Sequence, residues 1–290
     1  MLDVIIDTLL DTLKLLPFLY LSYLLMEFLE HRSGGAAERL LKRSGQIGPL
    51  FGAALGILPQ CGFSAAATGL YTGRIITVGT LIAVFLSTSD EMLPILISEG
   101  APVIFILKIL AAKLLIGIIA GFAVDLITGL ANKKKNVSAQ PQIEELCERE
   151  RCGCGSNFFL SALTHTLNIT VFILIFSFAL NAAIHFIGED TISGIALDMR
   201  FLGNAIASLI GLIPNCASSV ILTELYLGGV ISVGAMLSGL LVNAGIGVAL
   251  LFRNNRPIKD SFRIVGILLL VGVLSGFLLD ISPLAKFFTL

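Results

Sequence analysis

The sequence is poor in charged residues and has no tryptophan. Of its 290 residues, 13% are charged and 56% are hydrophobic, and the net charge is −1. A soluble domain usually carries about 25% charged residues, so an ordinary soluble fold is excluded. No basic cluster is large enough to hold a nucleic acid. Without tryptophan, anchoring at a membrane surface falls to Tyr, Lys and Arg, and Tyr71 and Tyr226 are the candidate anchors.

Histidine and cysteine are scarce as well. The three histidines, His31, His165 and His185, lie near the ends of apolar runs and do not cluster, which argues against a metal-hydroxide enzyme site. The five cysteines are odd in number, and the chain is not a small secreted one, so a disulfide framework is not expected. The sequence has no glycine-rich loop that would cradle phosphates, so ATP is not the direct energy source. We expect neither an enzyme nor a resident cofactor.

What the sequence does have is a series of long apolar runs. They recur from one end to the other, as at 15–26, 104–119, 169–180 and 264–279. Because about 20 apolar residues cross a bilayer as a helix, these runs predict an all-α polytopic membrane protein. Lys113 falls inside one run, where it would snorkel to the surface or pair with an acid.

The chain also repeats itself at a shift of 155 residues. Residues 56–91 and 211–246 are identical at 12 of 36 positions, among them Pro59/Pro214, Cys61/Cys216, Tyr71/Tyr226 and Gly79/Gly234. Apolar bias alone would not align proline, cysteine, tyrosine and glycine together. We therefore predict a first transmembrane repeat at 1–128, a cysteine-containing linker at 129–161 and a second repeat at 162–290.

Matching loops of the two copies carry opposite charge. Segment 31–46 holds four basic residues, whereas its counterpart 186–201 holds three acids and one arginine. Segment 253–263 is basic, and its counterpart 98–103 is not. Since loops rich in Lys and Arg stay inside, the second copy should be inverted relative to the first. The linker then faces the cytoplasm, and both termini face outside, in an inner or plasma membrane.

Each copy has too few residues for an extra pair of full spans. About 50 residues separate the inside loop ending near 46 from the outside loop at 98, whereas three spans need about 60. We predict a re-entrant helical hairpin with arms at 47–58 and 63–72, followed by a broken spanning helix at 75–97. Proline breaks a helix, so the tips are Pro59-Gln60-Cys61-Gly62 and, in the second copy, Pro214-Asn215-Cys216.

Polar residues interrupt the middle of the helix predicted at 75–97: Ser87, Thr88, Ser89, Asp90 and Glu91. An acid at mid-membrane costs about 3 kcal/mol, so such residues normally face a cavity and mark an ion pathway. A shorter helix that puts both acids at the outer interface is the alternative. In the second copy Asn243 aligns with Thr88, where it provides an amide oxygen or belongs to a packing surface of small residues.

The hairpin tips supply further candidate ligands: Gln60 and Cys61 in the first copy, and Asn215, Cys216 and Ser218 in the second. If the tips meet the acids at mid-depth, oxygen and sulfur ligands converge there. A mixed set with two carboxylates suits Mn²⁺ or another divalent transition metal, although a buried cysteine is often only a small hydrophobe.

The linker offers a separate set of thiols, Cys147, Cys152 and Cys154, among several glutamates. They are candidates for an accessory metal site that would capture a soft metal. Their spacing fits no standard zinc module, and a plain solvated loop is the alternative.

Taken together, these motifs resemble a known family. The two Pro-x-Cys tips, the stretch Ser-Thr-Ser-Asp-Glu, its partner Val-Asn-Ala-Gly and the cysteine-containing linker are similar to those of the ten-helix heavy-metal exporters. Members of that family are labelled arsenic-efflux proteins or manganese transporters. The resemblance covers essentially the whole chain and implies metal export. In architecture only, the hairpins and broken helices are similar to the ion-transporter superfamily that includes dicarboxylate carriers.

We therefore expect a secondary transporter that exports a divalent transition metal, with manganese favoured and with Asp90 and Glu91 exchanging metal for protons. Arsenite efflux through Cys61 and Cys216 is one alternative. A dicarboxylate or oxyanion carrier is another, because helix N-termini at the tips favour anions, but no Arg or Lys lies near either tip in sequence. The expected partners are the metal ion as substrate and the lipid bilayer, without nucleic acid, and a homodimer is the candidate assembly.

Overall fold

The computed structural model describes residues 47–57, 61–89, 92–133, 200–255 and 257–283, with residue 288 and a few residues between 16 and 24 and between 163 and 178. All regular structure within these residues is helical. The all-α prediction is confirmed for this part of the chain. The linker, with Cys147, Cys152 and Cys154, lies outside it.

The helices of the two copies begin at equivalent positions. The first copy contributes Ile47–Gly56, α3 (Cys61–Thr72), α4 (Val78–Ser87), α5 (Met92–Ser98) and α6 (Val103–Lys133). The second contributes α10 (Arg200–Gly211), α11 (Cys216–Leu227), α12 (Val233–Val242), α13 (Ile246–Asn254) and α14 (Ile258–Ile281). A shift of 155 carries the first residues of α3, α4 and α6 onto those of α11, α12 and α14. The inversion of the second copy relative to a bilayer stays a prediction, and so does the re-entrant course of each hairpin. α6 runs past the predicted repeat boundary at 128.

The two broken helices lie in the interior of the described structure, and the unbroken helices α6 and α14 lie at its perimeter. Among the residues that the structure describes, four segments are long and apolar enough to cross a bilayer: Val78–Ser98, Val103–Gly129, Val233–Asn254 and Ile258–Ile281. The two that contain the breaks are 75% and 94% buried, whereas the segments of α6 and α14 are 33% and 28% buried. Apolar side chains on α6 and α14 are accordingly exposed, as at Ile119 and Leu278. Such exposed apolar faces suit lipid contact. The broken helices are enclosed by protein.

An acid from the following helix caps the start of each broken helix. Asp125 of α6 accepts hydrogen bonds from the amide of Gly79 at 2.8 Å and the hydroxyl of Thr77 at 2.6 Å. Asp280 of α14, its counterpart, accepts the equivalent bonds from Gly234 at 3.0 Å and Ser232 at 2.7 Å. A carboxylate at a helix N-terminus accepts hydrogen bonds from amides that have no partner in the helix, and its negative charge interacts favourably with the positive end of the helix dipole. The internal repeat therefore extends to individual hydrogen bonds.

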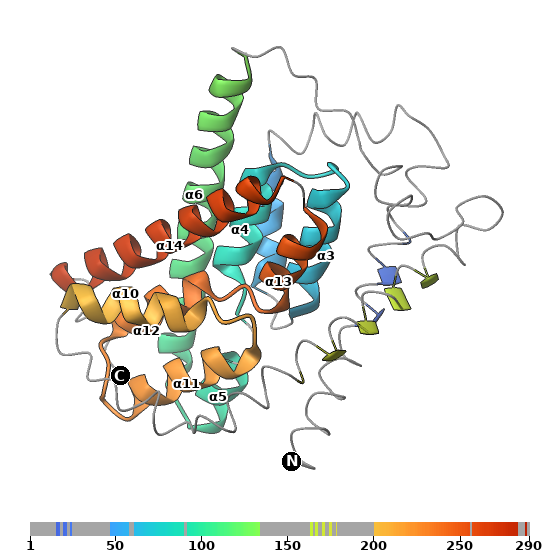
Figure 1. Ribbon diagram of the computed structural model, residues 1–290. Coiled ribbons are helices and arrows are strands. Elements are labelled where there is room, and N and C mark those ends of the chain that lie inside the picture. Colours follow the sequence, from blue (N-terminus) through green and yellow to red (C-terminus); the bar gives the residue numbers. More distant parts are fainter. Residues whose placement is uncertain are drawn as a thin grey trace.

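The two copies exchange contacts with each other. α13 of the second copy packs against α3 of the first, and α5 of the first packs against α11 of the second, as Figure 1 shows. The hydroxyl of Thr68 in α3 donates to the carbonyl oxygen of Gly247 in α13 at 3.1 Å. Reciprocal contacts of this kind are what a two-fold relation between the copies would produce.

The interpretation of Tyr71 as a surface anchor is wrong. Its side chain is 2% exposed, and its hydroxyl donates to Asp260 of the second copy at 2.5 Å. Tyr226, at the equivalent position, stacks on Phe105 of the first copy with the ring planes 5° apart. Both tyrosines contact the other copy, and the prediction that Tyr226 is an interface anchor stays a prediction.

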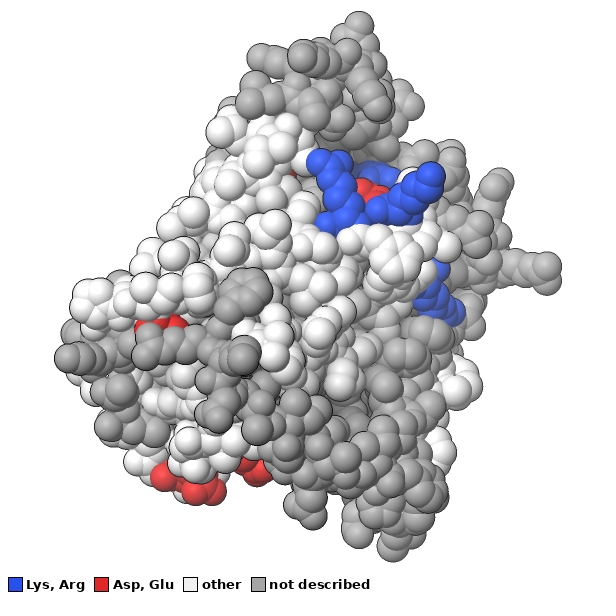
Figure 2. Space-filling view, turned by 60° about the vertical axis from the view of Figure 1, so that its left-hand side comes forward, with Lys and Arg blue, Asp and Glu red and all other residues white. Residues whose placement is uncertain are grey.

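Charge is unevenly distributed over the described part of the chain. On the face shown in Figure 2, Lys and Arg gather around an acidic group at one end, near where α14 begins in Figure 1. Acidic residues emerge at the opposite end and along one edge. This separation agrees with the charge difference between segments 253–263 and 98–103 on which the predicted orientation rests.

Candidate substrate site

The first helix break lies where the polar stretch predicts it. α4 ends at Ser87, and α5 begins at Met92. The C-cap residue Thr88 has a ψ of 129°, which is not helical. The hydroxyl of Ser87 donates to the carbonyl of Ala83 and that of Thr88 to the carbonyl of Val84, both at 2.8 Å. Such bonds compete with helix continuation, so this run of hydroxyl residues ends α4. Asp90 and Glu91 lie outside the described residues.

The first break is also tied to the end of the first hairpin arm. The hydroxyl of Ser89 donates to the carbonyl oxygen of Ile57 at 2.5 Å. Gly56 lies so close that a Cβ added to it would be 2.0 Å from Oγ of Ser87. The end of the first arm thus lies against the polar stretch, whereas the approach of the tip itself stays a prediction. Gln60 and the side chain of Cys61 lie outside the described residues.

The second break is made by Asn243 and Gly245. α12 ends at Val242, and Oδ1 of its C-cap Asn243 accepts a hydrogen bond from the amide of Gly245 at 3.0 Å. Gly245 has φ at +51°, a backbone conformation that residues with a Cβ rarely adopt, and α13 begins at the next residue. The predicted symmetry of position is therefore present, although one break is rich in hydroxyls and the other has an amide.

The second tip is a helix start. Asn215 is the N-cap of α11, and its Oδ1 accepts a hydrogen bond from the amide of Ala217 at 3.4 Å. The hydroxyl of Ser218 donates back to the carbonyl oxygen of Asn215 at 2.7 Å. Asn215 therefore has a capping role that sequence reasoning did not consider, and Ser218 binds back to the same residue. Cys216 begins α11, but its side chain lies outside the described part.

A lysine joins the two breaks, and sequence reasoning underestimated it. Lys113 of α6 is 1% exposed. Its ammonium donates to the carbonyl oxygen of Thr88 at the first break and, at 2.7 Å, to that of Leu240 in the last turn of α12. It neither snorkels nor stays at the edge of the site. The signal that could have found it is the repeat itself, because Lys113 aligns with Leu268, so the fold does not require a lysine there.

The breaks are therefore close together, buried and rich in oxygen. Ser87, Thr88, Ser89 and Asn243 are each at most 2% exposed, and one ammonium reaches carbonyl oxygens from both broken helices. No group of three His, Cys, Asp or Glu side chains is present among the residues that the structure describes. A metal shell completed by Asp90, Glu91 and the tip cysteines thus stays a prediction.

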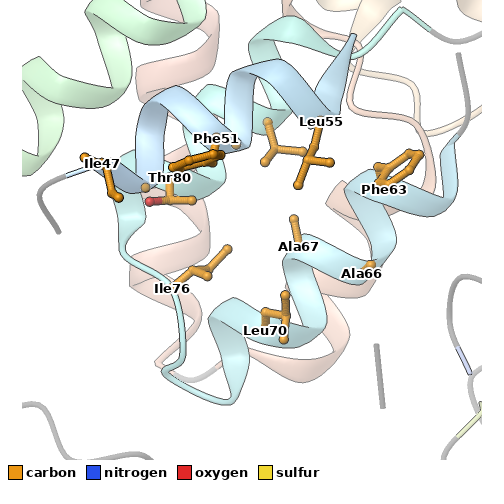
Figure 3. A pocket seen from close by; sticks show the side chains of 12 residues that line it. Ile47, Phe51, Leu55, Phe63, Ala66, Ala67, Leu70, Ile76 and Thr80 are labelled. Atoms are coloured by element: carbon orange, nitrogen blue, oxygen red, sulfur yellow. The ribbon is translucent and has the colours of Figure 1, made fainter. Parts of the chain in front are cut away.

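A nearby pocket in the first copy does not have the chemistry of an ion site. It has a volume of about 400 Å³ and separates helix 47–56 from α3. Figure 3 shows Phe51 and Leu55 on one side of it and Ala67 and Leu70 on the other. No carboxylate or thiol lines it, and Phe51 is 61% exposed. An apolar, open pocket of this kind suits lipid or another apolar group.

Comparison with known proteins gives a family match. A protein family described as "Putative, 10TM heavy-metal exporter" matches residues 1–197, which cover the first copy, the linker and the start of the second copy. No curated protein and no solved structure matches the chain.

Proposed function

The chain belongs to the family of ten-helix heavy-metal exporters, and from this premise we propose that it exports a divalent transition metal, manganese before others, through the two helix breaks. The observation that carries the proposal is that Lys113 reaches carbonyl oxygens from both breaks. Broken helices at the interface of two repeats are where secondary transporters bind their coupling ions and substrates. Membership of an exporter family also fits a protein that is not an enzyme.

The ligand chemistry favours manganese. Hydroxyl, amide and backbone oxygens surround the breaks, and two carboxylates, Asp90 and Glu91, directly follow Ser89. Oxygen ligands suit Mn²⁺, whereas softer metals prefer thiolates. In this proposal the carboxylates of Asp90 and Glu91 at the first break supply the negative charge, and Asn243 at the second break contributes its amide oxygen. The tip residues Gln60, Cys61 and Cys216 complete the shell in one state of the carrier.

Transport then follows from the repeat. A site between two copies opens alternately to the two sides when one copy rocks against the other. The carboxylates must be deprotonated to bind metal, so exchange for protons is the proposed coupling. The proposed orientation puts the linker and segment 253–263 in the cytoplasm and both termini outside. The linker thiols, Cys147, Cys152 and Cys154, would capture a softer metal at an accessory site and are not part of the pathway.

Lys113 also gives a specific reason to test an anion. The sequence argument against an oxyanion or dicarboxylate was the lack of a basic residue near the tips, yet the ammonium of Lys113 lies at the break to which the first arm is tied. An anion substrate would accept hydrogen bonds from this ammonium and from helix N-termini. Two acids in the same stretch oppose it, which is why the metal cation is preferred.

The test is transport by the purified protein in liposomes. The panel comprises Mn²⁺, Fe²⁺, Zn²⁺, arsenite and a dicarboxylate, each presented on one side with a pH gradient of either sign. We expect Mn²⁺ to be carried fastest and its flux to depend on the gradient. Flux of arsenite or of the dicarboxylate without flux of any divalent metal would overturn the proposal.

A further inference from the structure

Lys113 occupies a position that a cation substrate would also seek. Its ammonium bonds the carbonyl oxygens of Thr88 and Leu240, which belong to different copies. In an unbroken helix each of these carbonyls would accept a hydrogen bond from the amide four residues further on. The helices end at Ser87 and Val242, so the breaks free both carbonyls for other partners.

The freed carbonyls lie at the negative ends of two helix dipoles. The C-terminus of a helix carries about half a negative charge, and two such ends meet at one ammonium. Freed carbonyls at helix breaks are also the groups that hold coupling cations in secondary transporters. Lys113 therefore already provides a positive charge at a place suited to a metal ion.

The fold does not by itself require a lysine at this position of the repeat. The residue at the equivalent position of α14 is Leu268, which is fully buried and belongs to the hydrophobic core. One copy thus fills this place with a leucine and the other with a charged side chain. Burying an ammonium is costly unless it is well paired, so its presence in only one copy calls for a role that leucine cannot fill.

We propose that Lys113 is the resident counter-cation of the substrate site: its ammonium holds the carbonyls of both breaks when the site is empty, and the substrate cation must displace it. This inference rests on the proposed function, because it supposes that the substrate is a cation that binds at the breaks. The ammonium then sets the affinity of the site, since two positive charges cannot share the same oxygens. It also joins the copies in the empty carrier, which must reorient to complete a transport cycle.

The test compares the kinetics of Mn²⁺ transport in liposomes across four variants. Lys113→Gln and Lys113→Met remove the competing charge, and Lys113→Arg keeps it. Lys108→Gln removes the same charge from the same helix at a position that is not fully buried and is the matched control. We expect the neutral variants to lower KM for Mn²⁺ by about tenfold, an ordinary coupling between two competing ligands. Their maximal rate should fall as well, because no positive charge then offsets the carbonyls of the two breaks while the empty carrier reorients. Lys108→Gln should leave KM unchanged.

A merely structural lysine would behave differently. Neutral variants that are monodisperse but have an unchanged or higher KM would overturn the inference, and a higher KM would indicate that Lys113 binds an anion. Should the neutral variants fail to fold, Lys113→Arg decides, since its guanidinium stays charged and must leave KM at or above the wild-type value. Unchanged KM with normal Mn²⁺ transport rejects only the role of Lys113. A wild-type protein that transports no divalent metal rejects the proposed function, and this inference with it.

Discussion

Tyr71 and Asp260 join the two copies through a hydrogen bond of 2.5 Å from the phenol hydroxyl to Oδ2 of the carboxylate. The side chain of Asn255 donates to the same oxygen at 3.1 Å, and the guanidinium of Arg74 lies 5.7 Å from the centre of the tyrosine ring. The equivalent positions in the other half of the repeat hold Tyr226 and Phe105, whose ring centres are 5.6 Å apart. One contact between the copies is thus polar, and its counterpart is aromatic.

The polar contact should be the one that depends on a hydroxyl group. Tyr71→Phe removes a hydrogen bond to a charged acceptor, which typically contributes about 1.5–3 kcal/mol. We expect a loss of stability of that order, measured by thermal unfolding in detergent. Tyr226→Phe is the matched control, because the ring stack survives the change and the hydroxyl makes a long bond of 3.3 Å to the carbonyl of Phe288. Equal losses in both variants would show that the Tyr71 hydroxyl does not hold the copies together.

Close helix crossings make a second prediction about stability. A Cβ added to Gly234 of α12 would lie 2.4 Å from the carbonyl oxygen of Gly276 in α14 and 2.3 Å from Cγ of Asp280. Gly234→Ala should therefore separate the helices and cost about 1–3 kcal/mol, as overpacking does. Gly266→Ala on α14 is the control, since nothing lies within 4 Å of its added Cβ. It should gain about 0.5–1 kcal/mol, the ordinary difference between alanine and glycine within a helix. An unaltered melting temperature of Gly234→Ala would contradict the observed crossing.

The positions of the helix breaks could be predicted from the sequence, because residues that end a helix are recognisable locally. The hydroxyl run at Ser87–Ser89 and the glycine at Gly245 each disfavour continued helix. α4 ends at Ser87, and α12 ends at Val242, shortly before Gly245. The repeat carried the same boundaries into the second copy. Family membership was also predictable, since the resemblance drawn from the sequence motifs names the family that matches residues 1–197.

Partners across the fold were not predictable in the same way. Nothing near Tyr71 in sequence indicates Asp260, and a tyrosine at the end of an apolar run is typical of an interface anchor. For Lys113 the sequence left two alternatives, snorkelling to the surface or pairing with an acid. Its ammonium donates to the backbone carbonyls of Thr88 and Leu240, from the two copies, and no side-chain pattern can reveal such bonds.

The predicted orientation can be tested at two exposed residues, one just beyond α5 and one in the first turn of α14. In a cysteine-free background, single cysteines at Glu99 and Lys259 lie in segments that the charge pattern assigns to opposite sides. We expect a membrane-impermeant thiol reagent to label Glu99→Cys in intact cells and Lys259→Cys only after the membrane is opened. Leu268→Cys, at a fully buried position, is the control that neither condition should label. Labelling of both cysteines from the same side would exclude the inverted repeat.

The last prediction concerns the charge that binds the cation. Asp90→Asn keeps the shape of the side chain and removes one negative charge from the polar stretch. We expect it to abolish Mn²⁺ transport in liposomes while the amount of folded protein and its melting temperature stay close to wild type. The reason is that an acid within a membrane segment is retained only where a cation, a proton or a basic partner offsets its cost. Glu99→Gln, which removes an exposed acid just beyond α5, should transport Mn²⁺ at the wild-type rate.

The tip cysteines provide the contrast that separates a metal cation from arsenite. Cys61→Ser and Cys216→Ser replace a thiol with a hydroxyl at the first residues of α3 and α11. Because Mn²⁺ prefers oxygen ligands, each change should reduce its transport less than Asp90→Asn does. Arsenite is neutral at pH 7 and depends on thiols, so its transport would show the reverse order. If both serine variants are inactive and Asp90→Asn is active, the site binds its substrate through thiolates, and arsenite replaces manganese as the substrate.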